Sequence, residues 1–199
     1  MQRTRKLSMA GIAVGALALT VSTSIPLAYG HGYTTSPTSR AKFCADRVVQ
    51  NCGQIQYEPQ STEGPKGFPG AGPADGKLCS AGLSQFAQLD DQRNGAWPAT
   101  ALTSGATYTF RWHLTAAHAT TDFKYYVTKA NWSPNQPLTR AQLELVPFLT
   151  VPFNGARPGT EVSHSGRLPN RSGRHMILAV WTIADTANAF YQCSDVRFG

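Results

Sequence analysis

Several features that mark other classes of protein are missing from this sequence. It has no CxxC spacing for a thiolate zinc site and no HExxH pattern for a zinc hydrolase. Only 11 acidic residues are present and no acid pair stands out, which disfavours a hydrolytic glycosidase with two carboxylates. Lysine and arginine form no stripe, so no nucleic-acid partner is expected. Internal repeats and low-complexity linkers are also missing, which favours a single domain.

The sequence also lacks a continuous apolar run of the ~20 residues that a membrane-spanning helix needs. The apolar stretch Met9–Val21 follows a basic start, and Ser, Thr and Pro residues break it off early. Small residues, Ala28 and Gly30, stand at the −3 and −1 positions of a cleavage site. This pattern is typical of a secretory signal peptide over residues 1–30. We therefore expect a secreted, extracellular protein that keeps no membrane attachment after the signal is removed.

The expected mature chain, residues 31–199, has the size of one ordinary domain. Three of the 18 basic residues lie in residues 1–30, so 15 basic and 11 acidic side chains remain, a formal charge of +4. This mild and scattered charge indicates a soluble surface. We expect a single domain that acts as a monomer.

All four cysteines lie in the expected mature chain, and an exported protein matures where thiols oxidise. Two disulfides are therefore expected, and four cysteines allow three pairings. The short separation of Cys44 and Cys52 favours a local bridge. That choice leaves Cys79 to join Cys193, which would tie the middle of the chain to its last strand.

The two halves of the mature chain have different patterns. Residues 34–103 are rich in Gly, Pro, Ser and Gln, with short apolar pieces such as Leu83–Leu89 that could form a helical turn or two. A segment of this length without strands is usually functional or disordered, and its aromatic residues and cysteines favour an ordered one. From Ala106 onward, apolar residues alternate with polar ones, beginning with Tyr108, Phe110, Trp112 and Leu114.

Further strands are predicted over Phe123–Val127, His175–Ile183 and Phe190–Phe198. The turn residues between them fit antiparallel connections. We therefore predict an all-β, immunoglobulin/fibronectin-like sandwich with a large loop-helical insertion between the first strands.

Cleavage after Gly30 would make His31 the first residue. Its terminal α-amino nitrogen and its imidazole Nδ1 could then chelate one metal ion, which an internal histidine cannot do because its backbone nitrogen is an amide. His118 follows a strand within a run of small residues that leaves space around its ring. On spacing alone, a metal role and a structural role for His118 stay equally open. His113 is expected to be a solvent-facing strand residue, and the remaining two histidines, in a loop and at a strand start, are weaker candidates still.

A terminal amine and two imidazoles would form a set of three neutral nitrogen donors, which suits copper best among the common metals. The amine must lose a proton to bind, and with a pKa of ~7.7–8.0 it does so near neutral pH. Zinc is the alternative, although zinc hydrolases usually add a carboxylate or further histidines.

Longer segments of the sequence carry a more specific signal. Over nearly the whole mature chain they resemble the bacterial lytic polysaccharide monooxygenases once called chitin-binding proteins. The segments are His31-Gly32-Tyr33, Gln56–Ser61 (QYEPQS), Lys66–Pro69 (KGFP), Gly72–Gly76 (GPADG), Ile177–Trp181 (ILAVW) and Ala184–Gln192 (ADTANAFYQ).

The resemblance implies a copper site of the histidine-brace type. The amine and Nδ1 of His31 and a ring nitrogen of His118 would bind one ion that cycles between Cu(II) and Cu(I). Phe190 matches an aromatic residue that caps an axial position of the metal, and Glu63 matches an acidic residue that positions the oxygen species. Two further matches support the site from outside the ligand set: Ala116, which crowds the axial position, and Trp181 behind the ligands.

The resemblance also implies the reaction and the substrate. An external electron donor would reduce the copper, hydrogen peroxide or dioxygen would be the co-substrate, and β-1,4 bonds of crystalline chitin would be cleaved by hydroxylation at C1, which leaves aldonic-acid ends. The chitin-binding face would carry Tyr57, Glu58, Pro59, Asp185 and Asn188.

Two features depart from the family pattern. Ala117 stands before His118 where some relatives have a charged residue, and Cys79 with Cys193 suggests a different second disulfide. Two other functions stay open on the sequence: a non-catalytic protein that adheres to chitin, and a copper carrier without affinity for polysaccharide. Activity on cellulose is also left open.

Overall fold

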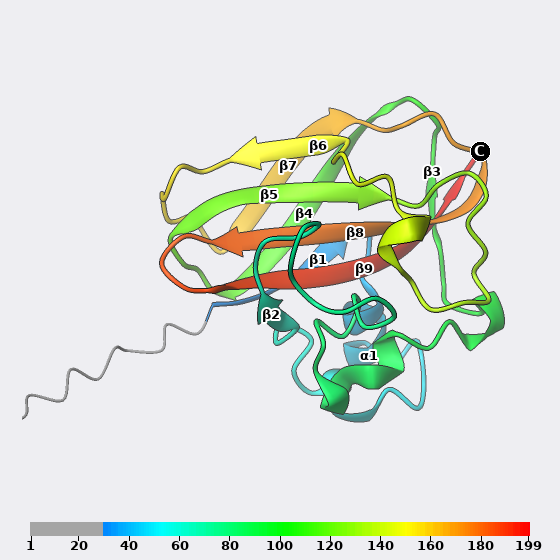
Figure 1. The fold of residues 1–199 in the computed structure, drawn as a ribbon, viewed down its shortest axis with the longest axis horizontal. Coiled ribbons are helices and arrows are strands. Elements are labelled where there is room, and N and C mark those ends of the chain that lie inside the picture. Colours follow the sequence, from blue (N-terminus) through cyan, green and yellow to red (C-terminus); the bar gives the residue numbers. More distant parts are fainter. Residues whose placement is uncertain (1–29) are drawn as a thin grey trace, which may run out of the picture.

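A computed structural model describes residues 30–199 of the chain (Figure 1), so the predicted signal peptide lies outside the described residues except for Gly30. Two β-sheets pack face to face, which confirms the predicted sandwich. The smaller sheet has the order β1 (His31–Ser36), β4 (Thr107–Ala116), β7 (Glu161–Arg167). The larger has the order β2 (Glu63–Pro65), β9 (Asn188–Phe198), β8 (Gly173–Ile183), β5 (Thr120–Val127), β6 (Leu149–Pro152), and β3 (Thr100–Leu102) pairs in parallel with β9.

The core between the sheets follows from the alternating pattern of the strands. In β4, Phe110, Trp112 and Leu114 are fully buried, whereas Arg111 between them is exposed. Successive side chains of a strand point to opposite faces, so one face of β4 packs inward and the other meets solvent. The same core contains Phe123 and Tyr125 of β5 and Trp181 of β8, among other buried side chains.

The insertion between β1 and β4 covers the outer face of the larger sheet. It is mostly loop, and it contains the short strands β2 and β3. Its four short helical segments are α1 (Arg40–Ala45), η1 (Gly53–Gln56), η2 (Ser84–Leu89) and η3 (Arg93–Gly95). The predicted helical turn at Leu83–Leu89 is η2, and the helical part of the insertion is small. A further short helix, η4 (Arg140–Gln142), lies between β5 and β6.

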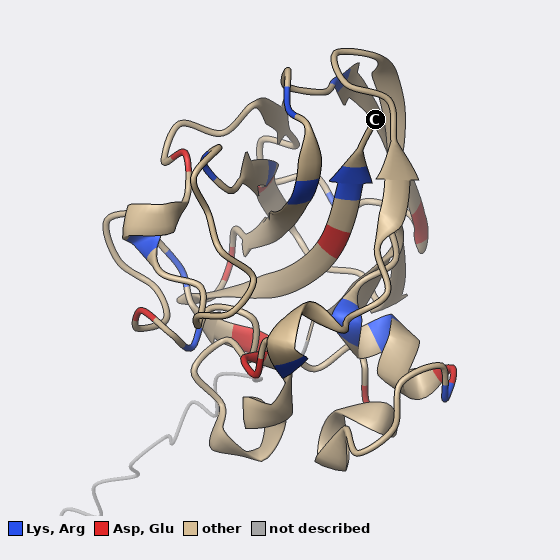
Figure 2. Ribbon diagram, turned by 90° about the vertical axis from the view of Figure 1, so that its right-hand side faces the viewer, with Lys and Arg blue, Asp and Glu red and all other residues tan. Residues whose placement is uncertain are grey.

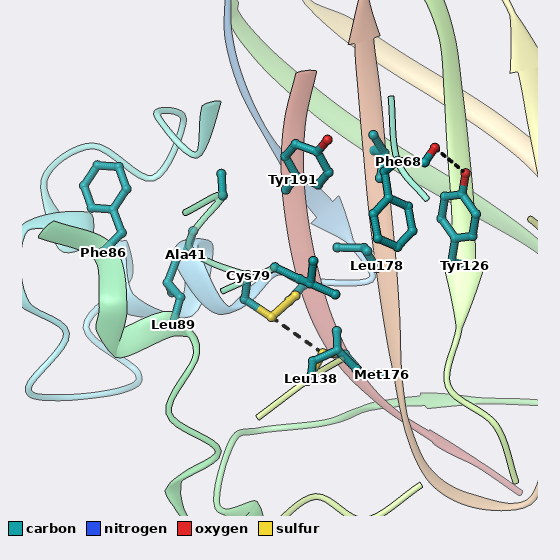
Figure 3. Close-up of a cluster of buried hydrophobic side chains, with 14 of the residues drawn as sticks. Ala41, Phe68, Cys79, Phe86, Leu89, Tyr126, Leu138, Met176, Leu178 and Tyr191 are labelled. Atoms are coloured by element: carbon teal, nitrogen blue, oxygen red, sulfur yellow. Dashed lines mark hydrogen bonds between the residues drawn. A yellow bond between two sulfur atoms is a disulfide. The ribbon is translucent and has the colours of Figure 1, made fainter. Parts of the chain in front are cut away.

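A second buried cluster joins the insertion to the larger sheet (Figure 3). Phe68 of the insertion packs edge-on against Tyr126 of β5 and Tyr191 of β9. The Tyr126 hydroxyl also donates a hydrogen bond to the Phe68 carbonyl. β5, β8 and β9 therefore bury side chains on both faces, which explains their nearly continuous apolar sequence.

Two disulfides fix the insertion, with the pairing that the cysteine spacing predicts. Cys44 is bonded to Cys52, which links α1 to the residue before η1. Cys79 is bonded to Cys193, which links the insertion to β9.

The charged residues are spread along the strands and the loops rather than gathered in a band of one sign (Figure 2). Within residues 30–199, no helix is long and apolar enough to cross a membrane.

Four pieces of chain meet at one end of the sandwich, on the left of Figure 1. They are the start of β1, the β4–β5 connection, the β6–β7 turn and the β8–β9 turn. The start of β1 is where the sequence predicts the new N-terminus, so this end holds the candidate site.

Candidate metal centre

Antiparallel pairing of β1 with β4 sets His31 opposite Ala116, the last residue of β4. His118 follows two residues later, in the connection to β5. The ladder therefore brings the two histidines predicted from the sequence to the same end of one sheet, although the whole insertion separates them along the chain.

Gly30 shows how tightly this place is enclosed. A Cβ atom built on Gly30 would lie 3.0 Å from Phe190 Cε2 and 3.2 Å from His118 Cδ2. Gly30, the last residue that signal cleavage would remove, thus occupies a small space beside the rings of Phe190 and His118. The ring centroids of His31 and Phe190 are 6.3 Å apart. Cleavage would leave the α-amino nitrogen of His31 beside that space.

This arrangement fits a copper ion held by an amine and two imidazoles. Within the described residues, no group of three or more His, Cys, Asp or Glu side chains could hold a metal. A site here would need a main-chain donor, and the terminal amine of His31 would be one. Gly32 allows β1 to lie close to the core, because a Cβ there would fall 2.5 Å from Leu114 Cδ2.

The connection that carries His118 is held by buried hydrogen bonds. The Thr120 hydroxyl donates to the His118 carbonyl at 2.9 Å and accepts from Trp181 Nε1 at 2.8 Å. Trp181 in turn stacks on Phe190, with 4.9 Å between ring centroids. Trp181 therefore contacts Phe190 directly and is linked to the backbone of His118 through Thr120. His118 itself is only 8% exposed, and its Nδ1 lies 3.9 Å from a carboxylate oxygen of Asp185.

Phe190 is fully buried and presents hydrocarbon to this space. It pairs with Glu63 across the β2–β9 ladder, and the Glu63 carboxylate accepts a hydrogen bond from Asn188 Nδ2 at 2.8 Å. A groove of about 690 Å³ runs beside the site, lined by His31, Glu58, Glu63 and Asn188 among other residues. The structure thus brings together the predicted ligand His31, the predicted acid Glu63 and two of the predicted sugar-binding residues.

The predicted sugar-binding loop lies next to β1. Tyr57 follows η1 with 66% of its surface exposed, and the Arg47 guanidinium lies over its ring at 5.1 Å from the centroid. Glu58 and Pro59 are half-buried, and the backbone N–H of Gly32 donates to the Gln60 carbonyl at 3.1 Å.

Gln192 is a supporting residue to which the sequence reasoning gave no role. Its buried Nε2 donates to the Pro59 carbonyl at 3.2 Å, to Thr62 Oγ1 at 2.7 Å and to the Gly32 carbonyl at 3.4 Å. It therefore joins the sugar-binding loop to the strand that begins with His31. The only available signal was its place in the Ala184–Gln192 segment, since a buried glutamine in a strand has no pattern of its own.

The other histidines lie away from this site. His113 forms an ion-pair contact with Glu161 on the outer face of the smaller sheet. His164, predicted in a loop, is instead a buried residue of β7, and its Nδ1 lies 2.8 Å from the Tyr125 hydroxyl. Burial lowers the pKa of His164 to about 4. His175 is also buried, and burial lowers its pKa.

A sequence profile of the family described as "Lytic polysaccharide mono-oxygenase, cellulose-degrading" matches residues 31–196. Among curated proteins, an AA10 family lytic polysaccharide monooxygenase C of Mycosarcoma maydis is 54% identical over 85% of this chain, and a GlcNAc-binding protein A of Vibrio cholerae is 45% identical over 92%. The matched region spans 52% and 40% of those two proteins.

Solved structures agree over their whole length. An AA10 lytic polysaccharide monooxygenase from Streptomyces lividans is 60% identical with a TM-score of 0.83, and 84% of this chain covers 100% of that one. A Bacillus amyloliquefaciens CBM33 protein in complex with Cu(I) is 43% identical with a TM-score of 0.77, with 85% and 100% covered. The profile match, the identity of its relatives and the common fold together show that this chain belongs to the AA10 family of copper-dependent lytic polysaccharide monooxygenases.

Proposed function

We propose that residues 31–199 form a secreted monooxygenase domain that cleaves β-1,4 bonds of crystalline chitin by hydroxylating C1. One observation carries the proposal: Gly30 lies against the rings of His118 and Phe190. Removal of residues 1–30 would therefore expose the His31 amine at the place where the second histidine stands.

In this proposal His31 and His118 hold one copper ion, which supplies one-electron chemistry when an external donor reduces it and hydrogen peroxide or dioxygen serves as co-substrate. The protein supplies geometry. Phe190 offers no donor atom, so the ion keeps only nitrogen ligands from the chain. Glu63, fixed by Asn188, presents a carboxylate that can accept a proton or a hydrogen bond at the edge of the site. Trp181 and Ala116 keep the surroundings packed, because groups outside the ligand set orient ligands and tune a metal.

Chitin is the substrate that the sugar-binding loop favours. The exposed ring of Tyr57 can stack on a sugar face, while Glu58, Asp185 and Asn188 can hydrogen-bond hydroxyl and acetamide groups. Relatives from Vibrio cholerae and Vibrio vulnificus that are named GlcNAc-binding protein A support the same substrate class. The family description names cellulose, so the products released from both polymers should be compared. Aldonic-acid ends would identify C1 as the oxidised carbon.

A protein with one extra residue before His31 tests the proposed ligand set. The extension turns the amine into an amide and displaces the new amine from chelating geometry. Copper affinity in calorimetry should fall by orders of magnitude, at about 1.4 kcal/mol for each tenfold step. The circular dichroism of the metal-free form should not change, because the sandwich core does not involve that atom.

If the extended protein binds copper as tightly as the processed one and releases oxidised fragments equally well, the amine is not a ligand and the proposal fails. A non-catalytic chitin-binding protein would give another result. The processed protein would adsorb to chitin, but mass spectrometry would find no oxidised oligosaccharides with or without reductant. A copper carrier would bind the metal but would stay in solution when mixed with chitin.

A further inference from the structure

Arg157 lies in the β6–β7 turn. This turn lies at the same end of the sandwich as the start of β1 and the β4–β5 connection (Figure 1). Its side chain is exposed, and its Nε donates a hydrogen bond to the Ala117 carbonyl at 2.7 Å. Ala117 is the residue directly before His118. A guanidinium group is therefore attached to the connection that carries a proposed copper ligand.

The backbone around Arg157 is well anchored. The N–H of Gly155 donates to the Thr120 carbonyl at 2.8 Å, and the N–H of Thr120 donates to the Ala156 carbonyl at 3.0 Å. The next residue, Pro158, is buried, and a following proline restricts the backbone of Arg157 to extended conformations. The turn thus fixes the backbone of Arg157, so that only its side chain remains to be ordered on binding.

The bond to Ala117 uses only one of the five N–H groups of a guanidinium. The two outer nitrogens have no hydrogen-bond partner within the described residues, and the side chain faces solvent. Asp185 is half exposed, with a carboxylate oxygen 3.9 Å from His118 Nδ1, and the Ala184 N–H donates to the Ala119 carbonyl at 2.8 Å. The connection that carries His118 therefore has both an acceptor, Asp185, and a set of donors, Arg157, beside it.

We propose that Arg157 is a further polysaccharide-binding residue. Anchored at Nε, it donates from its outer nitrogens to hydroxyl or acetamide oxygens of a chitin chain that lies across His118. This inference rests on the proposed function and extends the proposed binding face from the Tyr57 loop to the β6–β7 turn. Arginine suits this role because its planar fork can hold one hydrogen bond to the protein and still present others outward.

The test compares adsorption isotherms on crystalline chitin for the processed protein, Arg157→Ala, Arg157→Lys and the control Arg197→Ala. Arg197 is exposed near the far end of β9, so its variant loses the same charge away from the site. Arg157→Ala should bind chitin about fivefold more weakly, the factor for one hydrogen bond of ordinary net strength. Arg157→Lys should recover part of the loss, and Arg197→Ala should match the unmodified protein.

All isotherms are measured on metal-free protein and again in high salt, with copper affinity measured separately. The loss in Arg157→Ala should persist in both conditions, because chitin is neutral and a donor rather than a net charge is involved. Unchanged adsorption of metal-free Arg157→Ala overturns the inference, even if its copper affinity falls, since Arg157 would then only support the His118 connection. A loss that Arg197→Ala shares, or that high salt removes, also overturns it. If the unmodified protein does not adsorb to chitin, the proposed function itself fails.

Discussion

The sandwich and the insertion are stabilised in different ways. The sandwich is built from long antiparallel ladders, such as β8 with β9, around an apolar core. The insertion has only short helices and strands, and it is tied down by disulfides and by a buried ionic network. A segment without alternating apolar and polar residues does not form long strand ladders of its own. Disulfides and ion pairs therefore stabilise the insertion in their place.

The ionic network centres on Asp195 of β9, which is 1% exposed. Arg40 of α1 donates to it from Nε at 2.7 Å, and Arg174 of β8 donates from Nη2 at 2.8 Å. Arg40 also binds the Leu89 carbonyl and Gln92, which connects α1 to the end of η2. Burial lowers the pKa of the Arg40 guanidinium, and the neighbouring Asp195 opposes that effect.

The two regions also divide the proposed site. The proposed ligands His31 and His118, with Phe190, belong to the sandwich and its connections. Tyr57, Glu58 and Glu63 belong to the insertion. Changes that loosen the insertion should therefore impair chitin binding before they impair copper binding. The first three predictions below test how each region is stabilised, and the last tests the division of binding.

The largest effect is expected from removing the bridge between the two regions. The double variant Cys79→Ala/Cys193→Ala loses a cross-link between cysteines 114 residues apart, worth about 5 kcal/mol in the chain-entropy estimate. The matched variant Cys44→Ala/Cys52→Ala opens a link of separation 8, worth about 2.5 kcal/mol by the same estimate. Denaturant unfolding measures both free energies. Equal losses in the two variants would show that loop length does not decide the contribution.

Asp195→Asn should destabilise the protein by about 3–5 kcal/mol, because it leaves two arginines around a buried site without their carboxylate. Asp75→Asn is the control: Asp75 pairs with Arg140 at the surface, where an ion pair contributes about 0–1 kcal/mol. Thermal and urea unfolding of both variants give the comparison. Similar small losses would mean that the buried network does not hold the insertion in place.

The sandwich has its own test in the pH dependence of stability. His164 has a pKa of about 4 in the folded protein and an ordinary value near 6.5 in the unfolded chain. Between pH 6.5 and pH 4 the unfolded chain therefore binds a proton that the folded protein does not bind. The free energy of unfolding is highest above pH 6.5 in this respect, and it should fall by up to about 3 kcal/mol as the pH is lowered to 4. His164→Gln should remove this part of the pH dependence. The free energy of unfolding of both proteins is measured at pH 7 and at pH 4. If the difference between the two proteins is the same at both pH values, the assignment to His164 is wrong.

The smallest effect is expected at the surface of the insertion. Tyr57→Ala removes an exposed ring, so stability and copper affinity should stay nearly unchanged. Chitin adsorption should weaken by more than about 1 kcal/mol, as is typical for a well-placed aromatic contact. An adsorption isotherm identical to that of the unmodified protein would remove Tyr57 from the binding face.

Much of the fold could be predicted because its cause is local. Alternation in Tyr108–Leu114 specifies a half-buried strand, and the apolar run before Ile183 specifies one buried on both faces. His164 was placed wrongly because its surroundings in sequence, polar and small residues of an edge strand, resemble a loop. Its burial comes from Phe123 and Tyr125 of the opposite sheet, which no local pattern reveals.

The sequence by itself determined the four long strands β4, β5, β8 and β9, the cysteine pairing and the histidine that would begin the mature chain, since each depends on residue type, period or short spacing. Only the tertiary structure decided which groups meet. The β1–β4 register sets His31 beside the His118 connection, the buried Asp195 gathers arginines from two elements, and the β6–β7 turn carries Arg157 to the Ala117 carbonyl. These contacts join residues far apart in the chain, and they form because the ladders and cores fix the ends of the strands in space.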